Sequence, residues 1–357
     1  MTGRPATALR SLRDWGRAHP TAVHRVELLG GVAVLAVIVL RLGAGPFLDG
    51  LRAVDASTLL AGTLITAAVT TACAWRWRLV ARGLGVELSL GTAVAGYYRS
   101  LFLNSVLPGG VLGDVHRGAR SGRDTGDVGR GLRAVGWERL AGQLVLLALA
   151  LVVLSAAPSP VRPALPWVVA GLAAAALVLL ARRSRQPRTR GETPAVSNSP
   201  DSPVPRRAGW RQTVAADVRS GLLARPVWPG VVGGSVVSTA GQVLTFLVAA
   251  RAAGVTAPTG TVVPLALLAL VAMSVPLNVA GWGPREGVTA WAFGAAGLGA
   301  AQGVSAAVVY GVLVFVACLP GAVVLLATRR SPRRSVLPPD ARQPVPVGAS
   351  NSGAADG

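Results

Sequence analysis

Polar and charged residues gather at a break in an apolar stretch, NSVLPGGVLGDVHRGAR, residues 104–120. Asn104 precedes a Pro-Gly-Gly turn, and Asp114 and Arg117 follow it. Their three-residue spacing places Asp114 and Arg117 on one face of a helix, where they can form an ion pair. The pair either pins the segment at the membrane interface or leaves Arg117 partly free to hold a phosphate through its guanidinium fork. The residues expected to form this turn are Pro108, Gly109, Gly110 and Gly113.

A second break, PLNVAGWGPREGV, covers residues 276–288 and carries Asn278, Arg285 and Glu286. Proline is favoured in the first turn of a helix, and an acidic residue there is stabilised by the helix dipole. The sequence therefore predicts a helix that starts after the proline, with backbone N–H groups that can face an anion. The alternative is a plain helix cap with an interfacial ion pair. The residues expected to form this turn are Gly281, Gly283, Pro284 and Gly287.

A third polar group, Trp137, Glu138 and Arg139, precedes an apolar run at 140–158. Tryptophan and arginine are ordinary anchors at a membrane interface. Glutamate has no such preference, so Glu138 is expected to pair with Arg117 or Arg139. Small residues elsewhere are expected to be packing contacts between helices and to carry no chemistry. These are Gly233, Gly234, Ser235 and Ser238.

The elements that must position these groups are membrane-spanning helices. The chain is 52% hydrophobic and 14% charged, with a mean hydropathy of +0.52, whereas soluble domains are about 25% charged. Its apolar runs are long enough to cross a bilayer as helices and lack the alternation of barrel strands. The sequence therefore predicts an all-α polytopic membrane protein with six full spans. They are expected at 26–47, 56–75, 140–158, 164–181, 227–250 and 303–327.

The distribution of arginine predicts the orientation of these spans. The chain has a net charge of +20, and its basic residues lie in loops and tails between apolar runs. This favours positive-inside orientation over nucleic-acid binding. The arginine-rich segments, expected to be cytoplasmic, are the N-terminal tail, 76–82, 117–133, the loop at 182–225 and the C-terminal tail. Both termini are then cytoplasmic in a plasma-membrane protein.

Two irregular apolar segments must then enter and leave the membrane on the same side. Segment 90–113 is expected to be re-entrant from the cytoplasmic side, and segment 260–298 from the outer side. The halves, about 24–160 and 164–327, would form an inverted repeat, which is common in transporters with broken helices. Eight full crossings are the alternative. Residues 1–23, 182–225 and 328–357 are too polar to bury a core and are expected to be a basic tail, a disordered loop and a disordered tail.

No motif indicates a cofactor or a catalytic metal. The histidines are scattered, Cys73 and Cys318 lie singly in apolar runs, and neither a nucleotide-binding loop nor a catalytic triad is present. We therefore expect no metal and no cofactor, and enzymatic activity is not favoured.

Four motifs, in order, resemble the lysylphosphatidylglycerol synthase transmembrane-region family, whose members are also called flippase-like. They are NSVLPGGVLGDVHR, WERLAGQLVLL, PLNVAGWGPREG and CLPGAVVLL, within residues 24–327. One departure is Gly110-Val-Leu-Gly113, where the family pattern has adjacent glycines before the aspartate. The chain is also expected to lack a soluble domain for lysine transfer from tRNA, so the resemblance does not imply synthase activity. Family positions match at Asn104, Pro108, Gly109, Gly113, Asp114, Arg117, Glu138, Arg139, Gly283, Arg285, Glu286 and Gly287.

The resemblance implies movement of a lipid or a lipid-linked head group across the plasma membrane. The expected partner is a membrane lipid with an anionic or phosphate-bearing head group, held by Arg117, Arg139 and Arg285 with their neighbouring acids. Nucleic acid is not expected as a partner, and a cell-envelope enzyme or a homo-oligomer stays open. Two alternatives remain: an intramembrane transferase acting on a polyprenyl phosphate with Asp114 or Glu138 as base, and a non-transporting partner of a cell-envelope glycosyltransferase.

Overall fold

The computed structural model describes residues 35–107, 110–157, 210–274 and 283–330, with isolated residues at 32, 162–164 and 166. Every regular element in this part of the chain is helical, which confirms the all-α membrane fold. Among the described residues, four helical stretches are long and apolar enough to cross a membrane. They are α4 (Ala56–Gly83), α7 (Val128–Ala156), α10 (Trp228–Ala252) and Ala300–Ala327, which joins α13 (Ala300–Cys318) to α14 (Pro320–Arg330).

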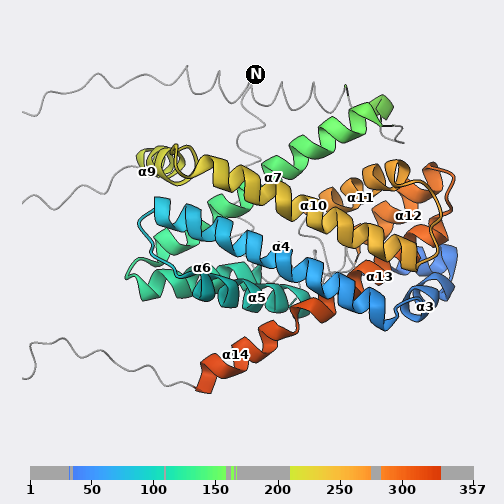
Figure 1. The fold of residues 1–357 in the computed structure, drawn as a ribbon, viewed down its shortest axis with the longest axis horizontal. Coiled ribbons are helices and arrows are strands. Elements are labelled where there is room, and N and C mark those ends of the chain that lie inside the picture. The colour runs from blue at the N-terminus through green and yellow to red at the C-terminus, as the bar shows by residue number, and fades with distance from the viewer. Residues whose placement is uncertain are drawn as a thin grey trace, which may run out of the picture.

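Shorter helices complete the described part of the chain. They are α3 (Gly45–Arg52), α5 (Leu90–Val106), α6 (Leu112–Asp124), α9 (Trp210–Asp217), the π-helix η2 (Val218–Leu222), α11 (Thr259–Met273) and α12 (Pro284–Ala295), with a single 3-10 turn, η1, at Arg162–Ala164. Figure 1 shows α4 and α10 crossing the middle of the molecule side by side, with α5 and α6 at one end and α11 and α12 towards the other.

The α4–α10 pair is antiparallel and tightly packed through glycines of α10. A Cβ at Gly241 would lie 2.3 Å from a Val69 methyl group, and one at Gly230 would lie 2.5 Å from a Leu79 methyl group. Residue numbers therefore rise along one helix as they fall along the other. Small residues let membrane helices approach this closely, and the pair forms the frame on which the two halves meet.

The α5–α6 pair forms a hairpin whose two outer ends lie together. Gly85, which precedes α5, lies beside Arg130 of α7, because a Cβ at Gly85 would be 3.5 Å from the Arg130 Nη1 atom. We call this end of the molecule, with loops 84–89 and 125–127 and the flanking Arg82, Arg123 and Arg130, the basic end. Gly110 has a φ of 62° in the turn, while the predicted turn residues Pro108 and Gly109 lie outside the described residues.

The α11–α12 pair forms a second hairpin that opens at the opposite end. The Gln302 side chain donates a hydrogen bond to the Gly254 carbonyl at 3.0 Å, which joins the loops before α11 and after α12. Because α10 runs antiparallel to α4, this far end is opposite the basic end. The two hairpins thus enter from opposite ends, as expected for an inverted repeat. Asn278 and Gly281 of the second turn lie outside the described residues.

Several helix boundaries differ from the sequence prediction. The helix predicted to end at 75 continues to Gly83, and the one predicted to begin at 140 begins at Val128. In both extensions one charged residue, Arg76 or Glu138, is buried, and the two form an ion pair inside the protein. Residues 210–222, predicted as part of a disordered loop, are helical. The last span is interrupted before Pro320, since proline lacks the N–H that would continue the helix.

Two further predictions depend on residues that are only partly described. Residues 35–42 of the predicted first span are helical, and residues before 32 lie outside the described part. Most of the predicted span at 164–181 also lies outside it.

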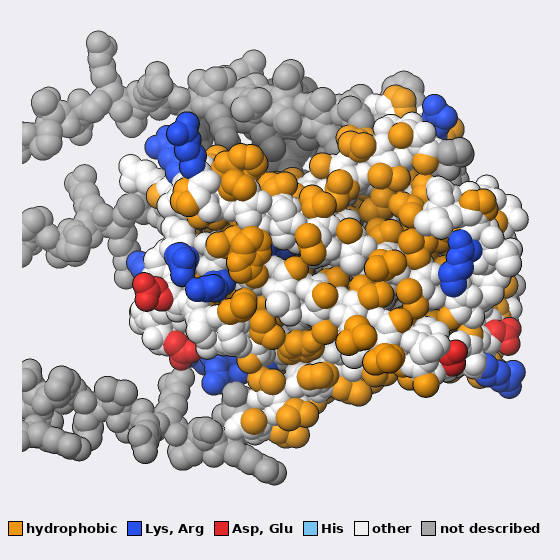
Figure 2. Space-filling model, in the orientation of Figure 1, with side chains coloured by type: hydrophobic (Ala, Val, Ile, Leu, Met, Phe, Trp, Pro, Cys, Tyr) orange, Lys and Arg blue, Asp and Glu red, His pale blue; other side chains and the backbone are white. Residues whose placement is uncertain are grey.

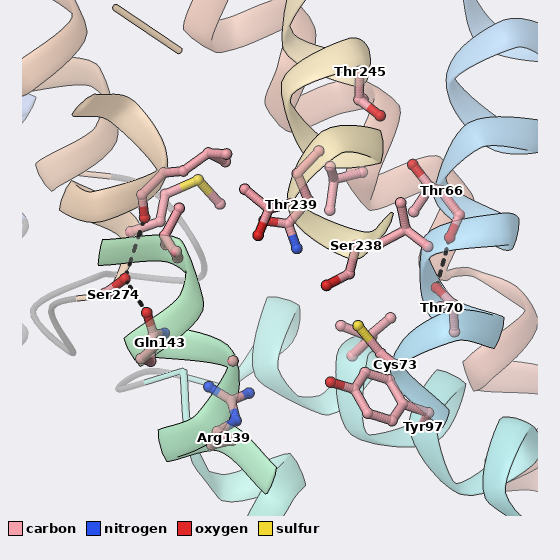
Figure 3. A pocket seen from close by; sticks show the side chains of 18 of the residues that line it. Thr66, Thr70, Cys73, Tyr97, Arg139, Gln143, Ser238, Thr239, Thr245 and Ser274 are labelled. Carbon is pink, nitrogen blue, oxygen red and sulfur yellow. Dashed lines mark hydrogen bonds between the residues drawn. The ribbon is translucent and has the colours of Figure 1, made fainter. Parts of the chain in front are cut away.

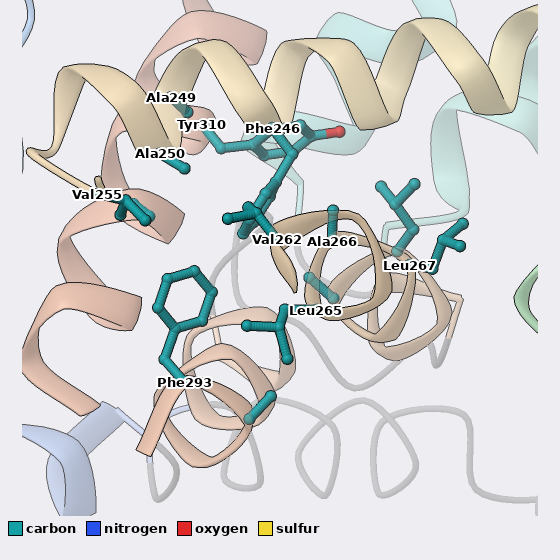
Figure 4. Close-up of a cluster of buried hydrophobic side chains, with 14 of the residues drawn as sticks. Phe246, Ala249, Ala250, Val255, Val262, Leu265, Ala266, Leu267, Phe293 and Tyr310 are labelled. Carbon is teal, nitrogen blue, oxygen red and sulfur yellow. The ribbon is translucent and has the colours of Figure 1, made fainter. Parts of the chain in front are cut away.

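One hydrophobic cluster lies around the second hairpin, and another, which includes Trp77 and Tyr97, packs α4 against α5 and α7. Figure 4 shows Phe246 and Tyr310 together, with Phe293 and Leu265 from the hairpin side. The Phe246 ring centroid lies 5.8 Å from that of Tyr310 and 6.4 Å from that of Phe293, within the range for favourable tilted aromatic pairs. Figure 2 shows hydrophobic side chains over the middle of this face and charged side chains mainly near its two ends.

Candidate functional site

Asp114, at the start of α6, is the centre of the first polar cluster. Its carboxylate accepts hydrogen bonds from the Ser100 hydroxyl at 3.0 Å and from the Asn104 amide at 2.8 Å. It also forms ion pairs with Arg117, at 2.9 Å, and with Arg139 of α7. The predicted pairing of Asp114 with Arg117 is therefore present, and it is part of a larger network that includes Arg139.

The break between α5 and α6 is held by direct contact between their backbones. The Gly113 N–H donates to the Asn104 side-chain oxygen at 2.8 Å. A Cβ at Gly113 would lie only 2.1 Å from the Ser100 carbonyl oxygen. Glycine is needed here because any side chain would push α6 away from α5, and Asp114 would lose its hydrogen-bond donors.

Arg117 is enclosed by aromatic and acidic side chains. It is 1% exposed, and its guanidinium carbon lies 4.2 Å from the Tyr97 ring centroid and 4.5 Å from that of Trp77. Its Nη2 atom donates to Asp114 at 2.9 Å and to Glu138 at 3.1 Å. Its Nε and Nη1 atoms are buried without a hydrogen-bond partner among the described residues.

Glu138 of α7 joins two buried arginines. Its carboxylate accepts from Arg117 and from Arg76 of α4, whose Nε atom lies 3.0 Å away. Glu138 is fully buried and Arg76 is 5% exposed. The predicted partner Arg117 is confirmed, whereas the direct contact of Arg139 is with Asp114. Exposed ion pairs contribute little, but removal of one partner of a buried pair is costly.

Arg76 and its serine partners were missed by the sequence interpretation. Arg76 was counted with arginines expected in a cytoplasmic loop, and Ser235 and Ser238 were expected only to pack helices. The Arg76 Nη1 atom donates to the Ser235 hydroxyl at 3.0 Å and to the Ser238 hydroxyl at 3.4 Å. The only available sequence signal was that Arg76 is flanked by tryptophans, Trp75 and Trp77, which extend the apolar run.

The second break carries a more local ion pair. Glu286 accepts from the Gly283 N–H at 2.7 Å and from the Arg285 Nε atom at 2.8 Å. The helix begins at Pro284, and Glu286 lies in its first turn, as predicted. Arg285 and Glu286 are both buried, and the Arg285 guanidinium lies 5.5 Å from the Tyr310 ring centroid. Gly287 follows in the same helical turn and is half-buried.

A cavity of about 260 Å³ lies between the two breaks. Arg76 and Arg139 line it from the side of the first hairpin, and Tyr310 and Ser274 line it from the side of the second. Figure 3 shows Arg139 on α7 opposite Ser238 and Thr239 of α10, with the Ser274–Gln143 hydrogen bond at one edge. The Arg139 side chain is 40% exposed, so it has room to meet a ligand.

The charge balance of the first cluster favours an anion. Arg76, Arg117 and Arg139 face only the two carboxylates of Asp114 and Glu138 within it. An unbalanced positive charge at membrane depth is costly unless a partner neutralises it. Arg139 is the one of the three that combines cavity lining with solvent exposure. The arrangement can therefore hold a phosphate against Arg139 while the buried arginines keep their acidic partners.

The cavity also contains a thiol. Cys73 lines it, and neither Cys73 nor Cys318 forms a disulfide. Within the described ranges, no group of three histidine, cysteine or acidic residues is arranged to hold a metal ion.

A sequence model described as the lysylphosphatidylglycerol synthase TM region matches residues 27–321, most of the chain. The match covers both hairpins, the ion-pair cluster and the cavity. Comparisons with curated proteins and with solved structures gave no match.

Proposed function

Because the chain belongs to the lysylphosphatidylglycerol synthase transmembrane-region family, we propose that it moves a phosphate-bearing lipid across the membrane through the cavity at Arg139. The family places the chain among membrane proteins of lipid metabolism or flippase-like role. The observation that carries the finer proposal is the partly exposed Arg139 side chain on a cavity between two broken helical hairpins.

The cavity suits a lipid head group rather than a whole lipid. Its volume of about 260 Å³ lies just below the range of small-ligand pockets, roughly 300–1,000 Å³. The acyl chains would then stay in the bilayer while the head group enters. Thr239, Gln242 and Ser274 also line the cavity and supply further hydrogen-bonding groups. These groups favour a polar head group with a phosphate at one end.

The ion pair between Asp114 and Arg139 lets Arg139 exchange its carboxylate partner for a lipid phosphate. When a phosphate binds Arg139, Asp114 still keeps Ser100, Asn104 and Arg117 as partners. Release of the phosphate allows Arg139 to return to Asp114. Binding and release therefore do not leave a buried carboxylate without donors, which would be costly.

The direction of the two hairpins favours access from alternate sides. The α5–α6 hairpin opens at the basic end and the α11–α12 hairpin opens at the far end. The arginines that flank the loops of the basic end, such as Arg82, Arg123 and Arg130, favour a cytoplasmic basic end in the plasma membrane. Small displacements of either hairpin would then open the cavity to one leaflet at a time, as in other inverted-repeat transporters.

Translocation of fluorescent phosphatidylglycerol in proteoliposomes tests this proposal. The change Arg139→Gln should slow translocation by about ten-fold or more, because a charge-assisted bond to phosphate is lost. The matched control is Arg130→Gln, which removes an exposed arginine paired with Asp127 at the basic end, and it should keep the wild-type rate. Both variants should elute as folded protein in size-exclusion chromatography.

A wild-type rate in Arg139→Gln would contradict the proposal. Absence of translocation by the folded wild-type protein would also contradict it. Mass spectrometry of the recovered lipid separates transport from chemistry, because a transferase would return a lipid of altered mass.

A further inference from the structure

The outer face of the α5–α6 hairpin contains two buried polar atoms without a hydrogen-bond partner. Among the residues that the structure describes, neither the Nε atom of Arg99 nor the Nδ1 atom of His116 has one. Arg99 is 6% exposed, so most of its side chain has been removed from water. Buried polar groups are almost always hydrogen-bonded because an unmet bond is costly. These two atoms therefore indicate a ligand that the described residues do not supply.

This face is separate from the ion-pair cluster. At 3.6 residues per turn, Arg99 lies about 160° around α5 from Tyr97, and Tyr97 is the residue that stacks on Arg117. The same spacing places His116 about 160° around α6 from Asp114. The partners of Asp114 and Glu138 thus face one side of the hairpin, and Arg99 and His116 face the other.

Further arginines surround His116 on this outer face. Arg120 and Arg123 follow it at four and seven residues, on the same side of α6. The positive charges of Arg99, Arg120 and Arg123 lie close enough to His116 to repel a positive charge on its imidazole. The nearby carboxylate that attracts Arg99 is that of Asp124. We call Arg99, His116, Arg120 and Arg123 the outer basic group, in which three arginines outnumber one nearby carboxylate.

We propose that the outer basic group is a second anion site, which binds one phosphate-bearing group. A guanidinium offers a planar fork that matches phosphate oxygens, and a neutral imidazole can donate or accept one further hydrogen bond. Arg99 supplies the buried end of the site. Arg123 is exposed and Arg120 is half-buried, so they supply a route from the surface.

Two sources of phosphate fit this chemistry. One is the head group of an anionic phospholipid beside the hairpin, and the other is a dissolved phosphate at the basic end. The site does not depend on translocation, because neither Arg99 nor His116 lines the cavity. Binding to it is consequently measured separately from transport.

Lipid binding to the full-length protein tests the first source. Native mass spectrometry would follow phosphatidylglycerol adducts on wild-type protein, on Arg99→Gln and on the control Arg82→Gln. Arg82 is an exposed arginine in the last turn of α4, so its loss removes the same charge near the same end. Arg99→Gln should weaken one phosphatidylglycerol adduct about ten-fold relative to the control, in line with loss of one charge-assisted bond.

Inorganic phosphate tests the second source. Calorimetric titration of phosphate into protein held in phosphatidylcholine nanodiscs should give binding that Arg99→Gln weakens and Arg82→Gln does not, if the ligand is dissolved. Weaker binding by Arg99→Gln than by Arg82→Gln in either experiment supports the site, and the experiment that shows it identifies the source. Binding by Arg99→Gln equal to the control in both arms would overturn it.

Two further variants keep the test decisive. If Arg99→Gln does not fold, Arg120→Gln removes a half-buried member of the same group, and the same comparison with Arg82→Gln applies. Arg139→Gln should leave this second site intact. A wild-type translocation rate in Arg139→Gln would therefore contradict the cavity proposal alone. Normal binding of both phosphatidylglycerol and phosphate by Arg99→Gln or Arg120→Gln would contradict the outer site alone.

Discussion

The α5–α6 hairpin is joined to its neighbours by ion pairs, whereas the α11–α12 hairpin contains its ion pair within two adjacent residues. Asp114 and Arg117 of the first hairpin reach Glu138 and Arg139 of α7, and Glu138 reaches Arg76 of α4. Glu286 of the second hairpin pairs with Arg285 next to it and caps its own helix. The second hairpin instead packs against the aromatic core shown in Figure 4.

This difference separates two ways to hold a broken helix in a membrane. A local ion pair moves with its hairpin, so motion of α11 and α12 need not separate charges. A distributed network must exchange partners when its hairpin moves, so it can respond to a charged ligand. The comparison therefore assigns ligand sensitivity mainly to the first hairpin, while both hairpins also pack in apolar clusters.

Loss of the Glu138 carboxylate, which Arg76 and Arg117 share, should destabilise the first hairpin more than any other change considered. Glu138→Gln leaves both Arg76 and Arg117 without a charged partner on α7, and such a loss costs about 3–5 kcal/mol. The melting temperature of detergent-purified Glu138→Gln should be well below that of Glu286→Gln, in which only Arg285 loses its adjacent acid. Restoration of part of the loss in the double variant Arg76→Gln, Glu138→Gln would confirm that the unpaired charge is the cause.

Equal melting temperatures for Glu138→Gln and Glu286→Gln would remove the proposed contrast. Such a result would mean that the network across helices adds no more stability than the local pair.

A methyl group at the first break should have the next largest effect. Gly113→Ala places a Cβ 2.1 Å from the Ser100 carbonyl oxygen, and such overpacking costs about 1–3 kcal/mol. The displaced α6 should also weaken lipid binding, because Asp114 and Arg117 move with it. Gly136→Ala on the exposed side of α7 meets nothing within 4 Å, and it should melt at or above the wild-type temperature. A stable Gly113→Ala protein with normal lipid binding would show that close contact at the break is unnecessary.

The smallest expected effect concerns the helix that follows the first hairpin. Asp127 caps α7, where its carboxylate accepts from the Arg130 N–H at 2.9 Å, and loss of such a cap costs about 1 kcal/mol. This hydrogen bond holds the pKa of Asp127 below its usual value. The contribution is therefore present above the unfolded-state pKa and is lost as the pH falls through the folded-state pKa.

Melting curves of wild-type protein and Asp127→Ala at several pH values check this prediction. The difference should be largest at neutral pH and should shrink in acid. A difference that grows in acid would contradict the capping role.

Much of the fold follows from local sequence features. Apolar length predicts the long helices, and Pro-Gly-Gly and Gly-Pro breaks predict the hairpins. The arginine-rich segments 76–82 and 117–133 are predicted to lie on one side of the membrane, and the loops next to them, 84–89 and 125–127, lie at one end of the molecule. The start of α12 at Pro284 and the pairing of Asp114 with Arg117 also follow from short-range spacing, which sequence preserves directly.

Long-range pairing could not be predicted from the same features. Arg76 looked like a loop arginine because its partners Glu138, Ser235 and Ser238 lie 62 to 162 residues away. Nothing in the sequence near Arg76 reports their position. The outer basic group was missed for a related reason, since only the packing of α5 on α6 brings Arg99 to His116.

Labelling of Cys73 tests most directly whether a lipid phosphate occupies the cavity. With Cys318→Ala, the chain keeps a single thiol, and it lines the cavity with Arg139. A water-soluble methanethiosulfonate reagent would be added to this protein in phosphatidylcholine nanodiscs with and without phosphatidylglycerol. We predict that phosphatidylglycerol slows Cys73 labelling several-fold and that Arg139→Gln abolishes this protection. An unchanged labelling rate with phosphatidylglycerol, in a protein whose Cys73 is labelled in its absence, would contradict the account.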